Sequence, residues 1–118
     1  MYRFTKIDDE EQIVGGVVYS PNEEDSDGDW TDAEEIWKAL KTWMLDGHDL
    51  RINHKGHAAN TDLVECFQAE GTGTVKGGEP VPDGAWFIAV RVGDDRVWKA
   101  IKDGAITGFS MAGRALTE

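Results

Sequence analysis

The segment GAWFIAVRVGDDRVWKAIKDGAITGFSMAG, residues 84–113, holds three consecutive elements whose order decides the fold. Residues 85–92 form an apolar run rich in aromatic and β-branched side chains, which predicts a buried strand. Residues 94–104 carry apolar side chains at helical spacing and predict a short amphipathic helix. Its inward-facing side chains are Val97, Trp98 and Ile101. Residues 106–116 predict a last strand with a turn.

The rest of the chain predicts more strands and one longer helix. Four further strands are expected, at 2–7, 12–20, 50–53 and 61–69. Thr31 and Glu34 fit a T-x-x-E capping box that opens a helix running to about Leu45. The apolar stripe of this helix consists of Ala33, Ile36, Trp37, Leu40, Trp43 and Met44. This order predicts one α+β domain over residues 1–118, with a mostly antiparallel sheet or barrel and two helices.

Glycines mark two further features. Gly15 and Gly16 interrupt the 12–20 strand and predict a bulge or a close backbone approach. Residues 71–84 are rich in glycine and proline, so we expect a mobile loop there.

Composition excludes several classes of protein. The 118 residues (13.0 kDa) contain no stretch approaching the roughly 18 apolar residues of a membrane helix. The start MYRFTKIDDEEQ lacks the order of a signal peptide, and the single Cys66 permits no internal disulfide. We therefore expect a cytosolic protein without a membrane partner.

The charge of the chain is strongly negative. The formal net charge is -11 and the isoelectric point is about 4.6. Such a chain repels nucleic-acid phosphates, so we expect no nucleic-acid partner. Acidity favours encounters with basic protein segments.

Two segments of the sequence resemble metal sites. His54 and His57 in HKGH have a zinc-compatible spacing, but Cys66 and His48 do not complete a ligand set, so we expect no metal there and read His57 as a solvated loop residue. Residues 23–34 nearly fit the calcium register of an EF-hand, yet Pro21 and a strand replace the preceding helix. A solvated loop is the expected state of this segment, and calcium binding is the alternative.

A serine, a histidine and a glutamate suggest nucleophilic catalysis. Ser110 lies in GFSMAGR, where Gly108 and Gly113 allow close backbone approach. His54 follows the alternation of Leu50 and Ile52 at the end of a strand. Two further groups complete the set, Glu65 as a carboxylate for the imidazole and Arg114 as an oxyanion donor. The alternation of the 61–69 strand puts Glu65 on the same face as Leu63 and Phe67. A serine in a turn and a glutamate on a solvated sheet face are the alternatives.

At these residues the chain resembles a known family. The ordered segments IVGGVVYSP, DSDGDWTDAEEIWKA, RINHKG, DLVECF and the 84–113 block are similar to the XkdF-like phage serine proteases. These are relatives of the prohead maturation proteases of tailed phages, and their fold is that of the herpesvirus assemblin proteases. The resemblance covers the chain from about Gln12 to Ala115.

The resemblance implies a serine endopeptidase that needs no cofactor. Ser110 would be the nucleophile, His54 the general base, and Glu65 or alternatively His57 the third member. Gly113 and Arg114 would support the oxyanion.

The resemblance also implies a place of action. Phage scaffold and capsid proteins would be the substrates, cleaved during procapsid maturation in the host cytoplasm, with self-association and self-cleavage as further expectations. The alternative is a noncatalytic structural or scaffolding module of the phage head.

Overall fold

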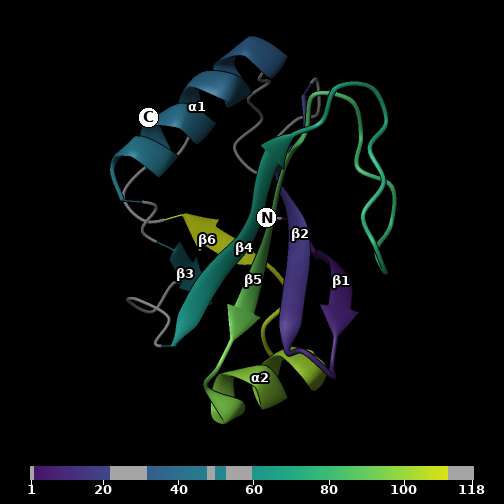
Figure 1. The fold of residues 1–118 in the computed structure, drawn as a ribbon, viewed down its shortest axis with the longest axis vertical. Coiled ribbons are helices and arrows are strands. Elements are labelled where there is room, and N and C mark those ends of the chain that lie inside the picture. The colour runs from purple at the N-terminus through teal and green to yellow at the C-terminus, as the bar shows by residue number, and fades with distance from the viewer. Residues whose placement is uncertain (1, 22–31, 48–49, 53–59, 112–118) are drawn as a thin grey trace.

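The computed structural model describes residues 2–21, 32–47, 50–52 and 60–111, with the backbone alone for 50–52 and 110–111. The elements in chain order are β1 (Phe4–Asp8), β2 (Ile13–Tyr19), α1 (Ala33–Leu45), β3 (Leu50–Ile52), β4 (Thr61–Gln68), β5 (Trp86–Val92), α2 (Asp95–Lys102) and β6 (Phe109–Met111). A four-stranded antiparallel sheet has the order β1-β2-β5-β4, and β3 pairs with β6 in a second small sheet (Figure 1). The predicted α+β class is confirmed.

Strand β5 lies in the centre of the sheet and is buried on both faces. Its sequence WFIAVRV is apolar except for Arg91, as expected for a strand covered on both sides. Ile88 and Val90 face one apolar cluster, whereas Phe87 and Ala89 face another. The domain therefore has two cores that share one strand.

The first core joins the sheet to both helices and to β6. Its buried members are Val14, Ile36, Leu40, Trp43, Trp86, Ile88, Val90, Val92, Trp98, Ile101, Ile106 and Phe109. The predicted burial of Trp98 and Ile101 in α2 is confirmed. This core fixes α1, α2 and β6 against one face of the sheet.

Helix α1 starts one residue later than the capping box predicted. Asp32 is its N-cap, and the Asp32 carboxylate accepts a hydrogen bond of 2.9 Å from the backbone N–H of Glu35. The pairing of Thr31 with Glu34 as a cap was therefore wrong, because Asp32 offers the same chemistry one position on.

The buried stripe of α1 is also narrower than predicted. Ile36, Leu40 and Trp43 are buried, but Trp37 is 45% and Met44 is 36% exposed. Ala33 is exposed as well. The expected burial of Ala33, Trp37 and Met44 was wrong, because the sheet covers only the narrow stripe of α1 formed by the three buried residues. The Trp37 ring instead lies under the Lys41 ammonium, 5.5 Å from its centroid.

Substitutions at two adjacent positions of α1 test which side of the helix faces the sheet. We expect Ile36→Ala to lower the free energy of unfolding by about 2–5 kcal/mol, because it opens a cavity in the first core. Trp37→Ala should cost less than about 1 kcal/mol, because that ring is largely at the surface. Chemical denaturation of both variants measures the difference, and equal losses would contradict the phase described.

The opposite face of the sheet is covered by residues 70–85, which we call the arm. In Figure 1 the arm lies on the other side of the sheet from α1. Gly73 and Val81 exchange two backbone hydrogen bonds of 2.9 Å, and the N–H of Glu79 donates to the Thr5 carbonyl of β1 at 3.2 Å. The prediction of a mobile loop was wrong, because Val75 and Val81 of the arm are buried and tie it to the sheet.

The predicted close approach at Gly15 is confirmed. A β-carbon at this position would lie 2.7 Å from Cζ of Phe87, which is fully buried on β5. Glycine therefore makes room for an aromatic ring of the second core.

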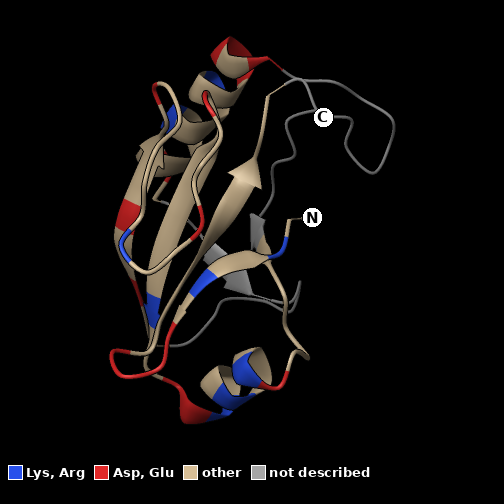
Figure 2. Ribbon diagram, turned by 90° about the vertical axis from the view of Figure 1, so that its right-hand side faces the viewer, with Lys and Arg blue, Asp and Glu red and all other residues tan. Residues whose placement is uncertain are grey.

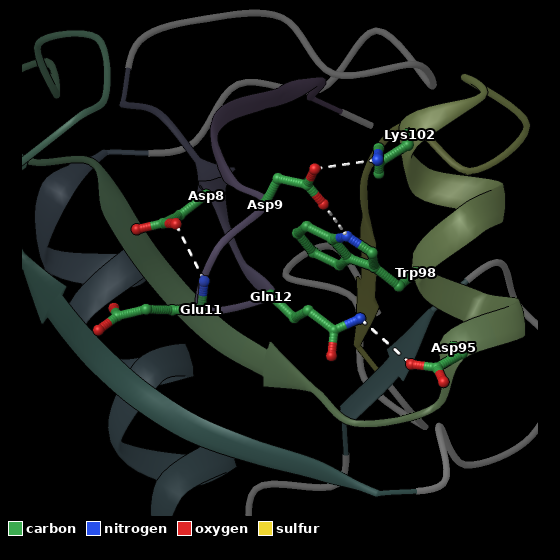
Figure 3. Close-up of polar contacts among 7 residues, drawn as sticks. All are labelled: Asp8, Asp9, Glu11, Gln12, Asp95, Trp98 and Lys102. Carbon is green, nitrogen blue, oxygen red and sulfur yellow. Dashed lines mark hydrogen bonds and ion pairs between the residues drawn. The ribbon is translucent and has the colours of Figure 1, made fainter.

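Helix α2 is attached to the β1–β2 turn by polar contacts (Figure 3). Asp9 accepts hydrogen bonds from the indole N–H of Trp98 at 2.8 Å and from the ammonium of Lys102 at 3.0 Å. On the other side of the turn, the Gln12 amide donates to Asp95 at 3.3 Å. Figure 2 shows this acidic turn beside the basic residues of α2.

These contacts predict a pH effect at Asp9. The hydrogen bond from Trp98, and then that from Lys102, lower the pKa of Asp9 below its ordinary value of 3.8. A folded-state pKa below the unfolded one adds stability above pH 3.8, and this stability is lost as the pH falls through the folded pKa. Wild type should therefore exceed Asp9→Asn in melting temperature at pH 7, and the gap should close in acid. Glu10→Gln in the same exposed turn is the control, and a gap that does not narrow as the pH falls below 3.8 would contradict the assignment.

Candidate functional site

Strand pairing positions the candidate nucleophile. Ser110 is the middle residue of β6, and the antiparallel register pairs it with Arg51, the middle residue of β3. Strand β3 ends at Ile52, two residues before His54 in the chain. The backbone pairing thus brings the segment leading to the predicted base alongside the predicted nucleophile.

The residues just before Ser110 are firmly attached to the main sheet. The backbone N–H of Phe4 donates to the Thr107 carbonyl at 2.7 Å. The buried Phe109 ring meets the Phe4 ring edge-on, with centroids 4.8 Å apart and planes at 72°. Gly108 between these contacts is also buried. The backbone at position 110 is therefore held against β1.

Several predicted site residues lie outside the described part of the chain. They are His54, His57, Gly113 and Arg114, together with most of the acidic loop 23–34. Within the described part, no group of three histidine, cysteine or acidic side chains could hold a metal ion. The possible zinc site at His54 and His57 and the possible calcium site in loop 23–34 involve residues outside the described part of the chain.

Glu65 is on the face of the sheet away from β6. A β-bulge in β4 shifts the register between Leu63 and Glu65, so Leu63 packs on the first core, whereas Glu65 lies opposite Ala89 of the second. The expectation that Leu63 and Glu65 share a face was wrong because of this extra residue. The structure does not bring Glu65 and the β6 strand together.

A lysine from the far edge of the sheet is the partner of Glu65. Lys6, Gly15, Ala89 and Glu65 form one row across all four strands. The Lys6 side chain is 11% exposed, and its ammonium lies 3.8 Å from the Glu65 carboxylate. Its stem crosses the two small residues between them. This pair could not be foreseen without the strand order.

Cys66 is a poor alternative nucleophile. Burial raises the pKa of the Cys66 thiol above its ordinary value of 9.0, and the nearby Trp86 indole opposes this rise. The thiol is therefore protonated at neutral pH, and thiolates rather than thiols are the reactive form.

The described part of the chain contains no helix long and apolar enough to cross a membrane.

Comparison with known proteins gives a clear family. The family model described as "Putative phage serine protease XkdF" matches residues 2–118. The "Phage-like element PBSX protein XkdF" of Bacillus subtilis (strain 168) is 38% identical over 113 residues, which are 95% of this chain and 40% of the relative. The "Uncharacterized protein YqbD" of the same organism is 35% identical over 109 residues, 92% of this chain and 33% of the relative.

The chain therefore spans well under half the length of these curated relatives. No solved structure matches it. The match to the family model extends over nearly every residue, and it includes both strands of the β3–β6 pair. The chain belongs to the XkdF family, whose description is "Putative phage serine protease XkdF".

Proposed function

We propose that this chain is a phage-type serine endopeptidase with Ser110 as nucleophile and His54 as general base. One observation carries the proposal: β3, which ends two residues before His54, is paired with β6, which contains Ser110. A serine hydroxyl becomes nucleophilic only when a base within hydrogen-bond reach takes its proton. The pairing of β3 with β6 brings the segment that leads to His54 next to the strand that carries Ser110.

The reaction follows from these roles. The Ser110 oxygen attacks a peptide carbonyl while His54 removes the hydroxyl proton, and the imidazolium then protonates the leaving amine. Water attacks the acyl-enzyme by the same route in reverse. Backbone amides near Gly113, with Arg114, bind the oxyanion in this scheme.

We assign the third member of the set to His57 rather than to Glu65. Glu65 already pairs with Lys6 on the face of the sheet away from β6. His57 follows His54 by three residues and is the alternative that the sequence offers for orienting the ring. Such a group holds the imidazole in the required tautomer and stabilises the imidazolium.

The substrates in this proposal are scaffold and capsid proteins of a phage head. Cleavage would take place within the procapsid in the host cytoplasm, and the protease would self-associate and cleave itself. The family description and the phage-like element named for one relative support this setting. The net charge of -11 favours basic segments as targets.

The test is covalent labelling with a fluorophosphonate serine probe, followed by intact-mass measurement. Wild type should gain one adduct, which both Ser110→Ala and His54→Ala should lose. Glu65→Gln should keep the adduct, because Glu65 pairs with Lys6 on the face of the sheet away from β6. If wild type gains no adduct, even in co-expression with neighbouring head proteins, the chain is a noncatalytic head module instead.

A further inference from the structure

The register of β3 and β6 places an arginine directly opposite the proposed nucleophile. Arg51 and Ser110 are Cα partners at the centres of two three-residue strands. In an antiparallel pair, the β-carbons of opposed residues lie about 4.5–5.5 Å apart. Residue 51 is therefore the direct cross-strand neighbour of the proposed nucleophile.

We propose that Arg51 supplies positive charge that stabilises the oxyanion formed when Ser110 attacks a carbonyl. This inference rests on the proposed function. In the attack, the bond from the serine oxygen to the carbonyl carbon forms, the hydroxyl proton passes to His54, and the π electron pair moves to the carbonyl oxygen. Negative charge appears on that oxygen only at this step, and guanidinium remains protonated at any working pH.

The placement of the other strand cations supports this role. Arg91 on β5 pairs with Asp62, its direct partner on β4, at 2.6 Å. Lys6 on β1 pairs with Glu65 at the end of its own cross-strand row. In both rows the cation is matched by an acid, whereas the cross-strand partner of Arg51 is a serine.

The charge of the whole chain makes a local cation useful. The sequence has 12 lysines and arginines against 23 aspartates and glutamates. The field of such a protein opposes the formation of another negative charge on its surface. An arginine at the register position opposite Ser110 brings a positive charge to this strand pair, which offsets that field.

The test compares rates of fluorophosphonate labelling, in which Ser110 displaces fluoride and charge develops on the phosphoryl oxygen. Arg51→Gln should slow labelling by about 100-fold or more, as loss of an oxyanion donor does. Arg51→Lys should keep the rate within about 10-fold, and added guanidinium chloride at millimolar concentration should partly restore Arg51→Ala. Arg91→Gln is the matched control and should label at the wild-type rate.

Three outcomes distinguish the role of Arg51 from the proposed function. Labelling of Arg51→Gln at the wild-type rate overturns the role of Arg51 and leaves the serine protease intact. Loss that neither lysine nor guanidinium restores, with a lowered melting temperature, makes Arg51 structural and also overturns it. A wild type that takes no label overturns the proposed function together with this inference.

Discussion

Replacing Ser110 with alanine should abolish cleavage of phage head proteins while leaving the fold intact. Loss of the nucleophile in serine proteases lowers turnover by about 10⁴-fold to 10⁶-fold. The backbone of β6 is fixed by Phe109 and by the bond to Phe4, so a change at position 110 leaves these attachments in place. Co-expression of the variant with scaffold and capsid proteins, followed by mass spectrometry of the products, measures the effect.

His54→Ala is the companion variant and should be about as inactive as Ser110→Ala. Members of such a set act as one unit, so the double variant should be no worse than either single variant. The melting temperatures of all three should match that of wild type. Cleavage by Ser110→Ala at the wild-type rate would contradict the assignment of Ser110 as the nucleophile.

Phe87→Ala should lower the free energy of unfolding by about 3–5 kcal/mol. The Phe87 ring is fully buried at the centre of the second core, 5.3 Å from the Phe67 ring, and it fills the space beside Gly15. Its removal leaves a cavity between the sheet and the arm. Urea denaturation of the variant measures the loss.

Two further variants make the Phe87 test specific. Val64→Ala on the neighbouring strand should cost less than about 0.5 kcal/mol, because Val64 is half exposed at the bulge. Gly15→Ala should be less damaging in the Phe87→Ala background than in wild type, because the ring that its methyl group meets is gone. Simple additivity of these two changes would contradict the packing described.

The sequence allowed the elements to be predicted well because their signals are local. The apolar run of β5 and the spacing of Trp98 and Ile101 each depend on a few adjacent residues. Asp32 displaced the predicted cap by one position because Thr31 and Asp32 are adjacent and both fit the capping rule, the first with Glu34 and the second with Glu35. The exposure of Trp37 depends on how much of α1 the sheet covers, and this cannot be predicted from a local sequence pattern.

The site was harder to predict because its parts are joined only by tertiary structure. Alternation alone put Glu65 and Leu63 on one face, and the bulge at Val64 separated them. The neighbour of Ser110 is Arg51, which is set by a strand register that depends on the whole fold. The packing of the arm likewise arises from Val75 and Val81 meeting a face built by other strands.

The contact between Phe4 and the Thr107–Phe109 segment has a consequence for the order of events during synthesis. These partners come from opposite ends of the described chain, so β6 can dock only after the ribosome has released nearly all of it. Contacts between residues so far apart in sequence are slow to form, because the long loop between them must close first. Under the proposed function, Ser110 would lack its β3 partner on the nascent chain, and cleavage would begin only once this domain has folded.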